Sequence, residues 1–187
     1  MRITETSLKG VFTIAPDIIA DARGAFMEIF HAEKFGQAGI KANFLQENIS
    51  LSKKGVIRAL HFQWDPPLGK FVRIIHGKAF AVAVDLRKNS ETLGRWLGFE
   101  LSGENRLQLF LPFGFAFGFC ALDDATELNY HFTVPWNPKG ESAIIWNDPD
   151  IGIDWPVTEP ILSGRDAQAG TFKEWLARPE SDKFRVH

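Results

Sequence analysis

A histidine, a lysine and a tyrosine stand in segments that are expected to be buried, and their types suit proton transfer. His61 lies in the run Arg58–Gln63, Lys70 shares the apolar face of the segment after it, and Tyr130 lies on the apolar face of a later segment. A neutral imidazole can take a proton near neutral pH, and a lysine is costly to bury unless its ammonium has a partner or a task. A hydrogen-bonded strand histidine and a core tyrosine are the structural alternatives, so only the combination points to catalysis.

Strand parity sets a condition on the Arg58–Gln63 segment. Successive side chains of a strand point to opposite faces, so Arg58 and His61 should face opposite ways. Both can serve one site only if the strand carries a bulge or if Arg58 acts from its end. The sequence leaves these two options open.

The elements that must position these side chains are mostly short β-strands. Apolar residues alternate over residues 80–86, 106–111 and 126–134, and turn signals separate the runs. Short helices are predicted around residues 32–37 and 171–177, the second stopped by Pro179. We therefore expect a mostly β fold, an antiparallel jelly-roll barrel with a few short peripheral helices. Residues 1–187 should form a single domain, with a C-terminal helical segment at about 167–187.

Charge and composition exclude several classes of function. A net charge of −2 gives no electrostatic basis for binding nucleic acid or an anionic membrane. The single cysteine, Cys120, rules out an internal disulfide framework and fits a reducing compartment. No signal-peptide-like or membrane-spanning run is present, so a cytoplasmic protein is expected. A Gly-rich dinucleotide fingerprint and a G-x-S-x-G elbow are also missing, so neither NAD nor a serine hydrolase is indicated.

A series of motifs in a fixed order carries much more information than any one residue. The motifs are D-A-R-G-A-F-M-E at 21–28, F-L-Q-E-N-I-S at 44–50, R-A-L-H-F-Q at 58–63, Lys70, P-F-G-F-A-F-G-F at 112–119, Tyr130, W-N-D-P-D at 146–150, D-W-P at 154–156 and L-S-G-R-D at 162–166. In this order and spacing the chain closely resembles the dTDP-4-dehydrorhamnose 3,5-epimerase family, from about Thr13 to Asp166.

The resemblance implies a cupin-type fold and a role for each matching residue. It makes His61 the catalytic base, Asp166 its partner, Lys70 the cation that stabilises an enolate and Tyr130 the acid. Substrate-binding positions fall on Arg23 and Arg58 for the diphosphate, on Gln46 and Asn48, on Phe117 beside the sugar, and on Trp136, Phe26 and Glu28 at the nucleotide base. Phe26 and Glu28 would reach the site from the neighbouring subunit of a homodimer.

The implied reaction inverts C3, C5 or both carbons of a nucleotide-diphospho-4-keto-6-deoxysugar. The C4 ketone acidifies the hydrogens on its neighbours, a carboxylate behind the imidazole fixes the tautomer, and an ammonium stabilises the O4 enolate. A phenol on the opposite ring face returns the proton. No cofactor is needed, and the nucleotide-diphosphate sugar would be the only small-molecule partner.

Four positions depart from the family pattern. Ala59 replaces the glycine of R-G-L-H, the loop from His61 to Lys70 is one residue shorter, Trp136 stands where a tyrosine is common, and Phe117 replaces the histidine of F-A-H-G-F. The last change removes a polar contact to the sugar, so it favours an enzyme that inverts only C3 or only C5, or that acts on another sugar. It also leaves His61 as the only candidate at the metal positions of other cupins, fewer than the three ligands that a catalytic site needs, so no metal is expected.

Two further functions stay open on the sequence. A 3,4-ketoisomerase on a related cupin fold would move the carbonyl rather than invert a carbon. A non-catalytic sugar-nucleotide-binding protein would bind without exchanging protons. Retention of His61, Lys70, Tyr130 and Asp166 together favours the epimerase.

Overall fold

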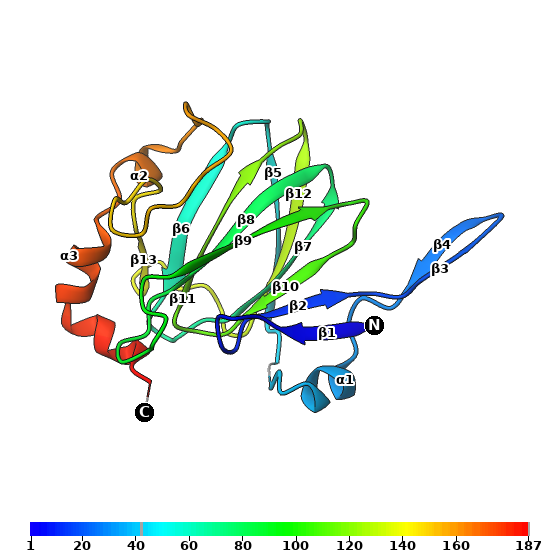
Figure 1. The fold of residues 1–187 in the computed structure, drawn as a ribbon, viewed down its shortest axis with the longest axis horizontal. Helices are drawn as coiled ribbons and strands as arrows, with labels where there is room; N and C mark the ends of the chain where they lie inside the picture. Colours follow the sequence, from blue (N-terminus) through cyan, green and yellow to red (C-terminus); the bar gives the residue numbers. More distant parts are fainter. Residues whose placement is uncertain (42, 187) are drawn as a thin grey trace.

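Two antiparallel sheets face each other and enclose a common interior (Figure 1). The structure, a computed structural model, describes residues 1–41 and 43–186. One sheet has the strand order β1 (Arg2–Glu5), β2 (Phe12–Ala15), β10 (Gln108–Leu111), β7 (Lys70–His76), β12 (Thr126–Phe132) and β5 (Gln46–Ser52). The other has the order β13 (Glu141–Ala143), β6 (Ile57–Gln63), β11 (Phe115–Ala121), β8 (Lys78–Asp85) and β9 (Trp96–Ser102). The predicted mostly β, antiparallel jelly-roll fold is confirmed.

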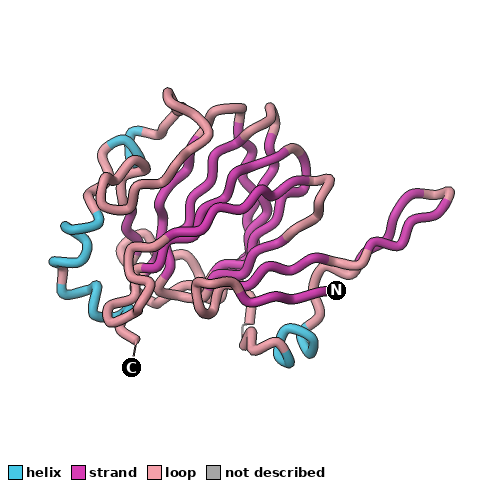
Figure 2. Tube along the Cα trace, viewed as in Figure 1, coloured by secondary structure: helices cyan, strands magenta, loops and turns pink. Residues whose placement is uncertain are grey.

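The helices are short and peripheral, as Figure 2 shows. They are α1 (Ala32–Gln37), α2 (Gly164–Ala167), α3 (Phe172–Ala177) and a 3-10 helix at Pro179–Phe184. The first and third match the two predicted helices, and α3 begins with a capping box in which Thr171 and Glu174 satisfy each other's backbone N–H groups. His187, the last residue of the predicted C-terminal helical segment, lies outside the described residues.

Separate apolar clusters pack the two faces of the five-stranded sheet. The inner face contributes Phe115, Phe117 and Phe119 to the barrel interior. The outer face contributes Val82 and Val84 to a second cluster, which the C-terminal segment covers. Strand β8 is thus buried on both sides, with its alanines facing the interior and its larger residues facing the helices.

The hairpin of β3 (Ile18–Asp21) and β4 (Gly24–Met27) extends away from the barrel (Figure 1). It forms a separate two-stranded sheet, and every residue of β3 is exposed. Isolated two-stranded hairpins are marginally stable in water. The β3 side chains therefore bury little surface against the described part of their own chain, residues 1–41 and 43–186.

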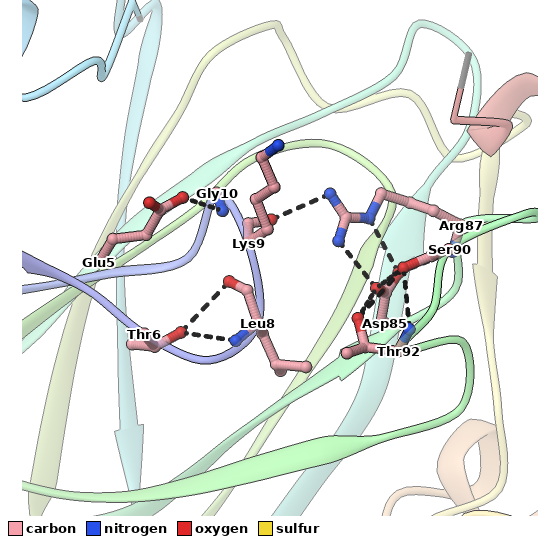
Figure 3. Close-up of polar contacts among 9 residues, drawn as sticks. All are labelled: Glu5, Thr6, Leu8, Lys9, Gly10, Asp85, Arg87, Ser90 and Thr92. Carbon is pink, nitrogen blue, oxygen red and sulfur yellow. Dashed lines mark hydrogen bonds and ion pairs between the residues drawn. The ribbon is translucent and has the colours of Figure 1, made fainter.

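Asp85, the last residue of β8, is the centre of a network of polar contacts (Figure 3). Asp85, fully buried at the end of β8, accepts hydrogen bonds from the Arg87 guanidinium at 2.8 and 2.9 Å and from the hydroxyls of Ser90 and Thr92 at 2.7 and 2.6 Å. Arg87 also donates to the Lys9 carbonyl at 3.0 Å. This network joins the 86–95 loop to the N-terminal loop.

Replacing Asp85 with alanine is expected to lower the thermal stability strongly. Burial alone would raise the pKa of this carboxyl, but the donors from Arg87, Thr92 and Ser90 lower it, so the carboxylate is ionised in the fold. Its contribution is full above its unfolded pKa and is lost as pH falls through the lower folded pKa. Removing one partner of a buried pair costs about 3–5 kcal/mol, or roughly 6–20 °C in Tm for a chain of this length.

Differential scanning calorimetry at neutral pH measures this change. Asp182→Ala is the matched control, because Asp182 is exposed and pairs with Lys88 at the surface. Its Tm should stay near that of the wild type. Equal Tm values for the two variants would contradict a structural role for the Asp85 network.

Candidate active site

A cavity of about 340 Å³ opens between the two sheets and gathers residues from both. Its lining joins polar and charged groups to aromatic rings: Gln46, Asn48, Arg58, His61, Lys70, Phe117, Phe119, Tyr130, Phe132, Trp136, Glu141 and Arg165. Nine of the twelve predicted site residues lie at this cavity or in direct contact with it: the eight lining residues among them, and Asp166, which binds His61.

The imidazole of His61 is held by a carboxylate from the C-terminal segment. Nε2 lies 2.6 Å from Oδ1 of Asp166, which belongs to α2 and is 4 % exposed, whereas the His61 side chain is 24 % exposed. The helix is capped by Ser163, whose hydroxyl accepts from the Asp166 N–H at 3.1 Å. Because Asp166 takes Nε2, the other nitrogen, Nδ1, is left for a reacting group.

A bulge in β6 brings Arg58 and His61 to the same cavity. Phe117 pairs with His61 and Phe119 with Arg58, so two residues of β11 span three residues of β6. Of the two options that the sequence left open, the structure has the bulge. Gly118 lies against it, and a Cβ there would meet the Cβ of Ala59 at 2.5 Å. Ala59 itself has no positive φ, so it needs no glycine.

Lys70 reaches the cavity from the six-stranded sheet despite the shorter loop before it. Its Nζ donates to the backbone carbonyl of His61 at 3.0 Å. The ammonium also lies 5.6 Å from the centroid of the Phe117 ring and 5.9 Å from that of Phe132. Burial lowers the pKa of Lys70 to about 8, against an opposing attraction from Glu141.

Tyr130 and the polar groups of β5 line the side opposite His61. Tyr130 belongs to β12 in the six-stranded sheet and pairs with Asn48 of β5. Gln46 donates to Asn48 at 2.9 Å and accepts from the backbone N–H of Trp136 at 2.8 Å. The Nδ2 of Asn48 is enclosed and has no hydrogen-bond partner among residues 1–41 and 43–186, so it is available as a donor to a ligand.

Several residues that line the cavity were not predicted from the sequence. The Glu141 carboxylate accepts from Trp136 Nε1 at 2.9 Å and pairs with Arg165 at 2.9 Å. Arg165 directly precedes Asp166, so the L-S-G-R-D motif held a signal for it. Glu141 stands in a short edge strand with no motif around it. Phe119 and Phe132 complete the aromatic part of the wall.

Three predicted binding residues lie away from the cavity. Arg23, Phe26 and Glu28 belong to the projecting hairpin or the residues just after it. The Arg23 side chain is 90 % exposed and pairs with Asp21, and Phe26 is 70 % exposed. Glu28 pairs with Lys34 of α1. A single chain therefore does not bring these three residues to the cavity, and their binding roles stay a prediction.

The described residues include no metal-ligating cluster. No group of three or more His, Cys, Asp or Glu side chains in residues 1–41 and 43–186 is arranged to hold an ion. Over the same ranges, no helix is long and apolar enough to cross a membrane.

Comparisons with known proteins give one consistent result. Residues 5–174 match the family model for dTDP-4-dehydrorhamnose 3,5-epimerase. A protein of that name from Methanothermobacter thermautotrophicus is 50 % identical over 92 % of this chain and 95 % of its own length. A dTDP-4-dehydrorhamnose 3-epimerase of Streptomyces niveus is 38 % identical over 90 % of this chain and 83 % of its own.

A solved structure shows the same fold with a sugar nucleotide bound. The dTDP-6-deoxy-D-glucose-3,5-epimerase of Legionella pneumophila, in complex with dTDP-4-keto-L-rhamnose, superposes with a TM-score of 0.91. It is 40 % identical, and the match covers 96 % of each chain.

Proposed function

The chain belongs to the dTDP-4-dehydrorhamnose 3,5-epimerase family, an isomerase family, and from this we propose that it inverts C3, C5 or both in a dTDP-linked 4-keto-6-deoxysugar. The observation that carries the proposal is the meeting of His61 and Tyr130 from facing sheets across one cavity, with Lys70 beside them. Dehydrorhamnose epimerases with either one or two inverted carbons occur among the relatives, so the family alone leaves the number open.

The first step is removal of a proton by His61. With Nε2–H donated to Asp166, Nδ1 carries the free electron pair and takes the hydrogen from the carbon beside the carbonyl. The buried carboxylate of Asp166 then stabilises the imidazolium that forms. The electron pair of the broken C–H bond moves onto O4 as an enolate.

Lys70 and Tyr130 complete the inversion. The ammonium stabilises the enolate oxygen because the aromatic wall keeps its surroundings poor in water. The Tyr130 hydroxyl then donates a proton to the carbon from the other ring face, which gives a neutral ketone with inverted configuration. The His61 imidazolium afterwards releases its proton to water, and the Tyr130 phenolate takes one up. Arg58, Gln46, Asn48 and Trp136 are proposed to hold the diphosphate, sugar and base.

Proton NMR in heavy water tests the proposed reaction on dTDP-4-keto-6-deoxyglucose. We expect deuterium at C3, C5 or both, a changed configuration at the exchanged carbon, and a carbonyl that remains at C4. A carbonyl at C3 would identify a ketoisomerase. Tight binding with no exchange at either carbon would identify a binding protein and refute the epimerase.

The catalytic rate should fall as pH rises through about 8. Lys70 serves as an ammonium, and its lowered pKa of about 8 means that it loses its charge above that pH. The alkaline limb of the kcat/KM profile reports this group in the free enzyme. Lys70→Arg, whose guanidinium stays charged, should retain part of the activity and lose this limb. A limb unchanged in Lys70→Arg would assign it to another group.

We also propose a homodimer in which each hairpin completes the partner's site. The exposed hairpin carries Arg23, whose side chain is 90 % exposed and pairs with Asp21 next to it, and Phe26, which is 70 % exposed. The outer face of β5 exposes Ile49 and Leu51 at 59 % and 65 %, and apolar side chains gathered on one face favour association.

A cytoplasmic location stays a prediction from the sequence.

Mixing two inactive variants tests this arrangement. His61→Asn lacks the base, and Arg23→Ala lacks a hairpin cation. If hairpins are exchanged, a mixed dimer holds one site with both wild-type residues, and re-equilibrated equal mixtures should recover about a quarter of wild-type sites. No recovery, with dimers present by light scattering, would show that Arg23 does not act across the interface.

A further inference from the structure

The cavity wall around Lys70 consists of phenyl rings on the side where the family motif has a histidine. Phe117 and Phe119 project from β11 into the interior, with ring centroids 6.3 Å apart, and Phe132 faces them from β12. All three are buried, at 6 %, 3 % and 8 % exposure. None of these side chains can form a hydrogen bond with a hydroxyl group of a sugar.

Phe117 lies where the reacting carbons are expected. It pairs directly with His61 across the strands, and its ring centroid is 5.6 Å from Lys70 Nζ. If Lys70 holds the carbonyl oxygen and His61 takes the neighbouring hydrogen, this ring lies against C3 or C5. In a 6-deoxysugar, C5 carries a methyl group, which suits a phenyl ring as it stands. Only the substituent on C3 decides whether the contact is favourable.

We infer that the site prefers 4-keto sugars without a hydroxyl on C3, a substrate class that rests on the proposed function and narrows it. A C3 hydroxyl against Phe117 would lose its hydrogen bonds to water on binding, and the phenyl ring would offer no hydrogen bond in their place. Two other polar side chains of the wall are engaged: Gln46 with Asn48 and the Trp136 backbone, and Glu141 with Trp136 and Arg165. The Nδ2 donor of Asn48, which is left for a ligand, belongs to β5 in the sheet that faces Phe117. Because a 3-deoxy sugar has no stereocentre at C3, inversion on this substrate takes place at C5.

The test compares the ratio of kcat/KM values for two substrates, dTDP-4-keto-3,6-dideoxyglucose and dTDP-4-keto-6-deoxyglucose. Deuterium incorporation at C5 gives both rates. The wild type should favour the 3-deoxy substrate by about tenfold, because a pocket rejects an added hydroxyl only moderately. Phe117→His, which restores the family residue, should lower this ratio at least about tenfold. Phe117→Leu keeps the wall apolar and should keep the wild-type ratio.

The outcomes separate the inference from the proposed function. Ratios within twofold of one another in the wild type and Phe117→His would overturn the preference, while the epimerase would stand. Exchange on neither substrate by the wild type would overturn both. Should Phe117→His fail to fold, Phe117→Gln supplies the same polar contact and is judged by the same ratio.

Discussion

Replacing His61 with asparagine is expected to lower kcat by about three orders of magnitude, with a much smaller change in KM. Removal of a general base costs about 10²–10⁴ in rate, and asparagine has no nitrogen that can accept a proton near neutral pH. It still fits the space and can bond to Asp166, which holds His61 at 2.6 Å. Ligand binding, which depends on other side chains of the cavity, should survive.

Stopped-flow or coupled assays of product formation measure this loss, and dTDP titration calorimetry measures binding. His76→Asn is the matched control, because His76 is exposed at the end of β7, away from the cavity lining. Its kcat should equal that of the wild type within about twofold. A His61→Asn enzyme with a tenth or more of wild-type kcat would remove His61 from the mechanism.

The Asp166→Asn variant should lose about 10²–10³ in kcat while it keeps its fold and its KM. The amide retains the shape of the carboxylate and its backbone bond to Ser163. It carries no charge to stabilise the imidazolium, and its NH₂ group can donate to Nε2, which would put the imidazole in the wrong tautomer. The loss therefore reports positioning and charge, not contact with substrate.

Asp150→Asn is the control for the Asp166 variant, since Asp150 forms a surface pair with Lys173. A positioning role predicts that ¹⁵N chemical shifts report a changed tautomer of His61 in Asp166→Asn. Identical imidazole shifts in Asp166→Asn and the wild type would contradict it, even if the rate fell.

Sequence patterns predicted the strands whose apolar side chains face a core. The alternation in residues 126–134 and 106–111 became β12 and β10 with that face turned inward. In β8 the larger residues instead face the C-terminal layer, because the sheet is covered on both sides. Alternation alone cannot tell which of two buried faces lies inside the barrel.

The strands before residue 56 were not predicted. β5 reads Q-E-N-I-S-L-S, with polar Gln46 and Asn48 lining the cavity and Ile49 and Leu51 exposed on the outer face. A strand that lines a polar site reverses the usual pattern of apolar inside and polar outside. Because β5 lines a polar site, its sequence lacks the pattern that would have predicted a strand.

The motifs predicted most of the residues at the cavity, and the other lining residues became evident only from the three-dimensional structure. Arg58 and His61 share a site only because β6 is bulged, which needs the close approach of Gly118. No sequence motif marked Glu141 as a cavity residue, since its position depends on a three-residue edge strand and on partners far away in the chain. Arg23 and Phe26 belong to the projecting hairpin and Glu28 follows it, so the fold of the single chain leaves all three away from the cavity. The single-domain organisation stays a prediction.

The central claim, that base and acid act from facing sheets, is tested most directly by Tyr130→Phe in heavy water. His61 and Lys70 remain in this variant, so hydrogen at the reacting carbon should still exchange for deuterium, within about tenfold of the wild-type rate. Inversion should fall by about 10²–10⁴ because the proton donor on the other ring face is gone. Exchange and inversion that fall together, or inversion at the wild-type rate, would contradict the account.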